Sequence, residues 1–147
     1  DEAAESLSKH KGWLSLDGLR SLSDAAVENL SKHKGFLDLQ GLESLSDSPG
    51  HIALAESLGR QDSEYELDLR SVTNLSDAAA ENLSKFKGCL YLYGLTGLSD
   101  LAAERLAKHQ GDLNIDLDNL PTSAAAILRK HRSFAENIEE DDHDNRD

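Results

Sequence analysis

The sequence predicts an α/β fold of stacked strand-turn-helix units whose parallel strands lie side by side. Two observations predict it. A 23-residue pattern recurs along most of the chain, and each copy passes from alternating apolar residues to apolar residues at helical spacing. The clearest copy is residues 67–89, LDLRSVTNLSDAAAENLSKFKGC. Because one unit leaves both of its sides open, the repetition indicates a solenoid in which each unit covers the next.

Each unit is predicted to contain a strand, a turn and a helix. In the clearest copy the strand is residues 67–69, because two leucines flank one polar residue and share a face. Residues 72–77 read as a turn and residues 77–87 as a helix, capped by serine or aspartate and ended by a left-handed Gly88. One continuous core is expected from the leucines at these positions: Leu37, Leu39, Leu42, Leu45, Leu67, Leu69, Leu75, Leu83, Leu90, Leu92 and Leu98.

The repeat divides residues 1–134 into one partial unit followed by five further units: 1–13, then 14–36, 37–66, 67–89, 90–112 and 113–134. The unit 37–66 is 30 residues long and so carries seven more residues than the regular 23-residue units, whereas the unit from Leu113 is one residue short. We expect a short helix at 51–58, ended by Gly59, and then a polar loop. The extra residues are either a tolerated surface insertion or a protruding partner contact.

The end of the chain is predicted to close the stack. Pro121 and the hydroxyl residues after it suit a helix start, and no glycine stops that helix. We therefore expect a capping helix that runs past His131 and Phe134 toward Ile138. Residues 135–147 hold the end of this helix and an acidic segment of net charge −6 from residue 136 onward, whose end is expected to be disordered.

Composition excludes several partners. The formal net charge is −13, which argues against nucleic acid and against anionic membrane surfaces. No apolar run is long enough to span a bilayer, and no signal-peptide pattern is found. The single Cys89 excludes an internal disulfide. The chain starts at Asp1 and has no methionine, so we expect a trimmed piece whose open N-terminal end could self-associate or dock on a partner.

The units resemble leucine-rich repeats. Apolar positions as in LDLQGLESL, residues 37–45, carry the likeness, and the closer match is to bacterial leucine-rich-repeat-like proteins with LSDAAAENLSKHKG units. The likeness covers residues 1 to about 134. The usual repeat has an internal asparagine ladder, which is absent here, and Gly18, Gly41 and Gly94 follow the strands instead. The resemblance implies a binding or scaffold role and carries no catalytic residues across.

A concave strand surface is the predicted binding site. Strands pack closer together than helices do, so a stack of such units should curve with its strands inside. Outward strand positions then form columns in which aromatic side chains stand among acids, which suits recognition. Alternatively, the first two aromatics merely cover a sheet edge. The candidate ligand-binding residues are Trp13, Asp17, Phe36, Asp38, Gln40, Asp68, Arg70, Tyr91, Tyr93, Asn114 and Asp116.

The sequence gives little support for a catalytic site or a metal site. Asp38 and Asp68 could share a hard cation as column neighbours, but solvated acids relieved by Arg70 are the simpler interpretation. Recurring histidines at helix ends could hold zinc, yet the helix dipole alone accounts for them. Cys89 has no histidine in its column, so no catalytic thiol is expected. The recurring histidines are His10, His33, His109 and His131.

The sequence therefore predicts a non-enzymatic module that binds a protein or peptide, favouring a basic partner, and that needs no cofactor. Two other classes stay open. The chain could be a structural or self-associating scaffold segment of a longer repeat protein. It could also be a carbohydrate- or cation-binding module that uses the tyrosine and aspartate columns.

Overall fold

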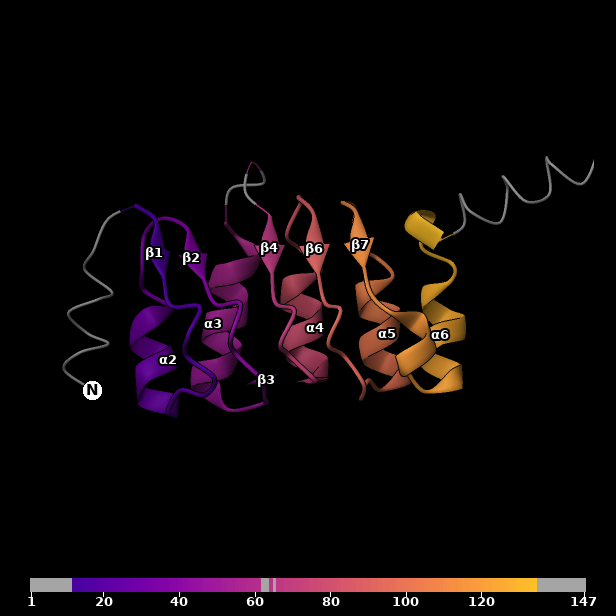
Figure 1. Cartoon of the computed structure of the whole chain (residues 1–147), viewed down its shortest axis with the longest axis horizontal. Coiled ribbons are helices and arrows are strands. Elements are labelled where there is room, and N and C mark those ends of the chain that lie inside the picture. Colours follow the sequence, from indigo (N-terminus) through magenta and orange to yellow (C-terminus); the bar gives the residue numbers. More distant parts are fainter. Residues whose placement is uncertain (1–11, 62–63, 65, 135–147) are drawn as a thin grey trace, which may run out of the picture.

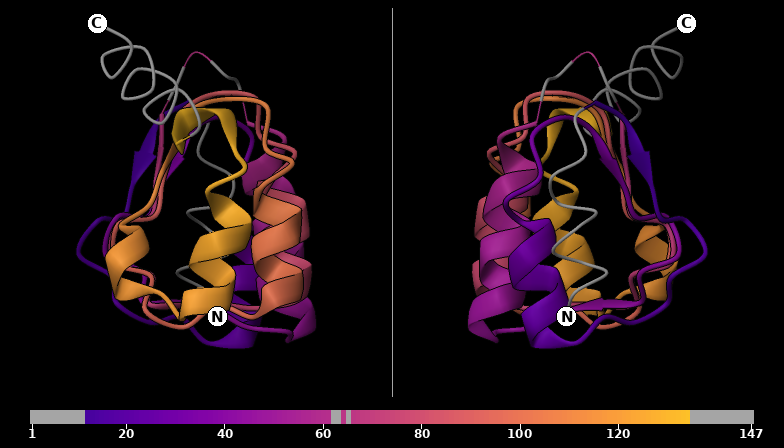
Figure 2. Two further views of the ribbon diagram at one scale, coloured as in Figure 1. Left: turned by 90° about the vertical axis from the view of Figure 1, so that its right-hand side faces the viewer. Right: turned by 90° about the vertical axis from the view of Figure 1, so that its left-hand side faces the viewer.

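The computed structural model describes residues 12–61, 64 and 66–134. Its fold is α/β, with short parallel strands on one side and a row of helices on the other (Figure 1). Viewed along its length, the successive units superimpose, as Figure 2 shows. The predicted partial unit 1–13 and the end 135–147 fall almost wholly outside the described residues, as does any self-association through residues 1–11.

The main strands and helices recur at the expected spacing. The strands that begin the units are β1 (Leu14–Ser15), β2 (Leu37–Asp38), β4 (Leu67–Asp68), β6 (Leu90–Tyr91) and β7 (Leu113–Asn114). The helices are α2 (Asp24–Leu30), α3 (Pro49–Gly59), α4 (Asp77–Leu83), α5 (Asp100–Leu106) and α6 (Thr122–Leu128). Each helix contacts the next one along the chain. A 3₁₀ helix, η1 (Leu117–Asn119), precedes α6.

The main strands pair in the predicted register but do not form one sheet. Leu14 lies opposite Leu37 in one pair, and Leu67, Leu90 and Leu113 lie opposite one another in a three-stranded sheet. The described residues show no pairing of β2 with β4. Two further strands that the sequence did not predict, β3 (Ser44–Leu45) and β5 (Asn74–Leu75), join these halves by pairing in parallel.

The insertion explains the break between β2 and β4. The backbone N–H of Leu37 donates to Oε1 of Gln61, at 2.9 Å, so a side chain that follows α3 satisfies a donor of β2. Backbone hydrogen bonds hold the two units together elsewhere, as between Thr73 N–H and the Glu43 carbonyl at 2.9 Å. The stack of strands is therefore interrupted where the unit is longest, while the row of helices continues.

The helices of the regular units are shorter than predicted. Residues 77–87 were expected to be helical, but α4 ends at Leu83, and the 72–77 turn contains β5. After α4 the chain tightens, with Phe86 N–H donating to the Leu83 carbonyl at 3.0 Å, and this turn carries the Phe86 ring fully into the core. Gly88 is not left-handed, since the described residues with positive φ are Gly12 and Gly35. The same turn follows α2 and α5, where it carries His33 and His109 inward, so the early helix end is a property of the regular unit.

The helix of the insertion is longer than predicted, and its glycine has another role. Instead of 51–58, α3 spans Pro49–Gly59, with Ser48 accepting a hydrogen bond from the His51 N–H. Gly59 is the last residue of α3, so the helix ends at the predicted glycine, although without a positive φ. A Cβ atom there would stand 2.2 Å from the carbonyl oxygen of Asn82, so the glycine also permits close approach of the end of α4.

The predicted capping helix is interrupted. α6 ends at Leu128, and helical backbone resumes at residues 132–134. Between them His131 turns inward and is 3% exposed, which a continuous helix did not anticipate. The predicted course toward Ile138 lies outside the described residues.

The core prediction is confirmed. All eleven leucines named above are buried in one continuous cluster. Pairs of alanines in the helices, such as Ala79 with Ala80 and Ala102 with Ala103, are also buried. Small residues at these positions let neighbouring helices pack closely.

Candidate functional site

The structure places most of the predicted ligand-binding residues on the strand side of the molecule. We call the eleven residues named above the strand face. Its middle column is confirmed in two stretches, because Ser15 lies opposite Asp38, and Asp68, Tyr91 and Asn114 lie opposite one another. The third column follows each strand, where Asp17, Arg70, Tyr93 and Asp116 are exposed and Gln40 is half-buried.

Two tyrosines form the centre of the strand face. The rings of Tyr91 and Tyr93 have centroids 5.7 Å apart, and Tyr93 is 48% exposed while Tyr91 is half-buried. The Tyr91 hydroxyl donates to Oε1 of Glu66 at 3.2 Å. Its hydrogen bond with Cys89 raises the pKa of the Tyr91 phenol, and burial and the Glu66 carboxylate act in the same direction. Tyr91 therefore stays protonated, and its half-buried ring packs beside the more exposed ring of Tyr93.

The structure does not bring together Asp38 and Asp68, the two acids that the sequence placed next to each other. Nη2 of Arg70 lies 2.5 Å from Oδ2 of Asp68, and Nε lies 3.0 Å from the same oxygen. This ion pair raises the pKa of Arg70, mainly through the hydrogen bonds that the guanidinium donates to Asp68. Asp38 stands on β2, which does not pair with β4, so the predicted column neighbours are separated by the break in the strands. In the described part of the chain no group of three His, Cys, Asp or Glu could hold a metal ion.

Phe36 is the residue that the prediction misplaced. It was expected to face outward, but it is 8% exposed, and its ring centroid lies 4.4 Å from that of Trp13. Phe36 directly precedes β2 and lies beside the gap between β2 and β4, where its ring is turned away from solvent. Trp13 is 55% exposed, so of this pair only the indole offers a large accessible surface.

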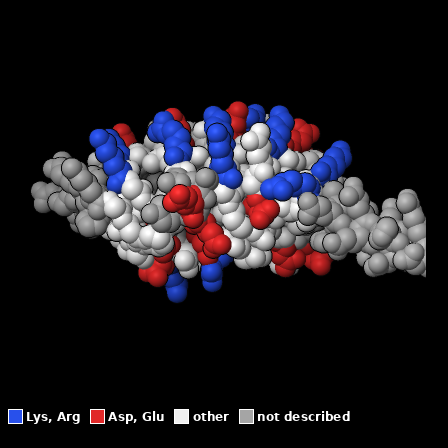
Figure 3. All heavy atoms as spheres, turned by 90° about the horizontal axis from the view of Figure 1, so that it is seen from above, with Lys and Arg blue, Asp and Glu red and all other residues white. Residues whose placement is uncertain are grey.

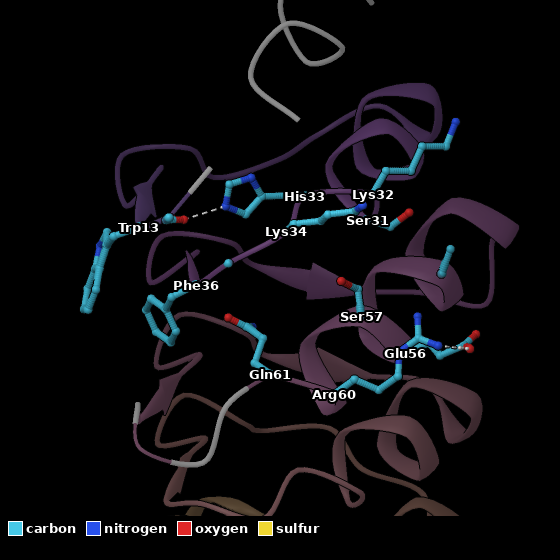
Figure 4. Close-up of a pocket in the computed structure, with 13 residues that line it drawn as sticks. Trp13, Ser31, Lys32, His33, Lys34, Phe36, Glu56, Ser57, Arg60 and Gln61 are labelled. Atoms are coloured by element: carbon cyan, nitrogen blue, oxygen red, sulfur yellow. Dashed lines mark hydrogen bonds and ion pairs between the residues drawn. The ribbon is translucent and has the colours of Figure 1, made fainter. Parts of the chain in front are cut away.

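A cavity of about 780 Å³ opens beside this aromatic pair, and the sequence did not predict it (Figure 4). Its walls are residues 31–36, the C-terminal part of α3, and Gly12 with Trp13. It exists because α3 has 11 residues where α4 has 7, and because β2 lacks a neighbouring strand on this side. Gln61 lines it, and Nε2 of Gln61 is buried without a hydrogen-bond partner among the described residues. A second hollow of about 330 Å³ lies between residues 84–87 and 108–110.

The recurring histidines tie neighbouring units together. His33, His109 and His131 are buried, and their Nε2 atoms lie 2.9, 2.9 and 2.6 Å from the carbonyl oxygens of Gly12, Gly88 and His109. Burial lowers the pKa of His109, and neighbouring His131 adds to this. A neutral ring that donates from Nε2 fits both facts. The helix dipole alone was therefore too simple an interpretation, and these rings supply bonds between units where the asparagine ladder is missing.

Phe86 interrupts the histidine column between His33 and His109, and it is fully buried. His10 lies outside the described residues. The described helices include none that is long and apolar enough to cross a membrane.

Comparison of the chain with protein-family models, curated proteins and solved structures found no match. The resemblance to leucine-rich repeats stays a prediction.

Proposed function

We propose that the chain is a leucine-rich-repeat-type solenoid that binds a protein or peptide on its strand face without catalysing a reaction. The repeated register of the main strands and the row of helices behind them support the architecture. Backbone hydrogen bonds hold these short strands in place, so their side chains have little conformational freedom. Binding a partner therefore costs less conformational entropy.

The observation that carries the proposal is the Tyr91–Tyr93 pair. Tyr93 is 48% exposed although it follows a strand that is paired on both sides. Folding does not require a large exposed ring there, because Leu90 and Leu92 already fill the core. Aromatic anchors on rigid backbone often contribute most of the energy of an interface. Trp13 offers a second exposed ring on the same side.

Charge favours a basic partner. Asp17 and Asp116 are exposed, whereas Asp68 is tied to Arg70. Exposed carboxylates around an aromatic anchor speed the approach of a cationic segment and favour its orientation.

The test uses peptides selected on the immobilised chain from a random display library, with affinities then measured by isothermal titration calorimetry. Tyr93→Ala should weaken binding by about tenfold or more, because it removes the anchor. Leu101→Ala is the matched control, since Leu101 is 44% exposed but lies on α5. Peptides whose affinity survives Tyr93→Ala but is lost on shortening the loop after α3 would contradict the proposal.

A further inference from the structure

Cationic side chains gather on one edge of this acidic chain. Of the 15 lysines and arginines, Lys9, Lys11 and Arg146 lie outside the described residues. Nine of the remaining twelve lie between the last turn of a helix and the strand or helical turn that follows it. We call them the basic edge: Lys32, Lys34, Arg60, Lys85, Lys87, Lys108, Arg129, Lys130 and Arg132. Figure 3 looks onto this edge and shows lysine and arginine side chains gathered along one side of it.

Most of these charges lack a counter-charge. Arg60 pairs with Glu56 at 3.2 Å, and Arg132 pairs with Asp112 at 3.3 Å. For the other seven, no ion pair is found in the described part of the chain, although the sequence has 28 acidic residues. The dipole of each helix favours a cation at its C-terminal end. It supplies only a partial negative charge, so the row as a whole stays unneutralised.

The basic edge is also hollowed. The cavity of about 780 Å³ is bordered by Lys32, Lys34 and Arg60. The hollow of about 330 Å³ is bordered by Lys85, Lys87 and Lys108. Each hollow therefore brings three cations from two neighbouring units around one depression, which suits an extended acidic segment better than a single small anion.

We propose that the basic edge is the docking surface of the chain's own acidic segment, residues 136–147. This segment has seven carboxylates and one arginine, a formal charge of −6. It follows Phe134, whose ring centroid lies 6.3 Å from that of His131, and Nη2 of nearby Arg132 contacts the Gln110 carbonyl at 3.0 Å. The segment thus leaves the described structure beside the cations of the last units.

The length of the segment is sufficient. Thirteen residues, 135–147, extend up to about 45 Å at ~3.5 Å per residue. Helices pack about 8–10 Å apart, so the hollow at Lys85, Lys87 and Lys108 lies within reach, and the larger one is near the limit. Each exposed ion pair is weak and is screened by salt, so docking is a sum of several such contacts that weakens as ionic strength rises. Attachment to the same chain compensates through a high effective concentration.

The experiment places a nitroxide spin label in the segment of the full chain. Asn145→Cys carries the label, and Cys89→Ser removes the natural thiol. Amide signals of ¹⁵N-labelled protein at residues 84–88 and 107–111 should lose about half of their intensity or more at an ionic strength of about 0.01 M and recover at about 1 M, where the Debye length falls from about 30 to about 3 Å. Signals of residues 68–70 on the strand face should not change.

Charge variants make the test specific. Lys85→Gln with Lys87→Gln should at least halve the relaxation effect at residues 84–88, whereas Arg20→Gln, an exposed cation away from the edge, should leave it unchanged. Equal effects of both variants, or no relaxation at the edge at low salt, would overturn the proposal. Relaxation that appears only when spin-labelled ¹⁴N protein is mixed with unlabelled ¹⁵N protein would also overturn it, since the occupant would then be a second copy. None of these readouts depends on Tyr93.

Discussion

At the scale of single residues, the histidines matter most, because they combine burial, a hydrogen bond and a titratable proton. His109 is 3% exposed and donates from Nε2 to the Gly88 carbonyl. The ring of His131 stacks over it, with centroids 6.1 Å apart and an interplanar angle of 17°. Burial, and to a smaller extent the neighbouring His131, disfavour the protonated form of His109 and lower its pKa.

This arrangement predicts a pH dependence of stability. Burial holds the pKa of His109 below its ordinary value of 6.5, so the unfolded chain binds a proton at a higher pH than the folded chain does. The free energy of unfolding should therefore fall as pH drops below about 6.5, and the loss should level off below the pKa of the folded state. Denaturant titrations between about pH 8 and pH 5 would measure it.

His109→Phe is the informative variant, because Phe86 occupies the equivalent place in its own unit. The variant loses one hydrogen bond at every pH, but the part of the pH dependence that His109 causes should disappear. A profile with an unchanged slope would assign that slope to other groups.

At the scale of elements, the contact between α3 and α4 depends on a glycine. Ala favours a helix over Gly by roughly 1 kcal/mol, so Gly59→Ala would ordinarily stabilise α3. Here the added Cβ would stand 2.2 Å from the Asn82 carbonyl oxygen, and that atom is backbone. We therefore expect Gly59→Ala to lower the free energy of unfolding in a denaturant titration, because the two helices must move apart.

Gly18→Ala is the matched control. A Cβ atom added at Gly18 would have no heavy atom within 4 Å, and Gly18 has no positive φ. The substitution should be neutral or stabilise by up to about 1 kcal/mol through the unfolded state. Stabilisation by Gly59→Ala equal to that of the control would show that the helices are not in close contact.

At the scale of the whole molecule, the insertion divides the strands into two groups while the helices continue past it. The first group is β1 with β2, and the second is β4, β6 and β7. Gln61 supports the free side of the first group through the Leu37 N–H. The two groups should therefore differ in their local stability.

The variant Gln61→Ala should reveal this difference in local stability between the two groups of strands. Without the side-chain acceptor, the Leu37 amide and its neighbours in β1 and β2 should exchange hydrogen faster. Amides of β6, which donate to β7 as in Leu90 N–H to the Asp112 carbonyl at 2.9 Å, should keep their rates. Hydrogen exchange followed by NMR measures both sets in one sample. Equal acceleration in both groups would mean that the strands open as one unit.

Sequence reasoning could predict the features that repeat. The unit length, the strand register and the buried leucines follow from local periodicity, because a residue such as Leu90 has the same apolar role as Leu67 and Leu113. Most of the strand face could be predicted for the same reason, since alternate strand residues point to opposite faces. The acidic character of the chain also needs no structure.

Only the tertiary structure decided what depends on contacts between units. Phe36 turned inward, the histidines became donors to the preceding unit, and Gly59, besides ending α3, allowed α4 to pack closely. The cavity beside Trp13 arises where the insertion prevents β2 and β4 from pairing. A local pattern reports the preference of a segment, whereas burial, hydrogen-bond partners and hollows depend on the neighbour that packs against it, and in this chain the irregular unit changes that neighbour.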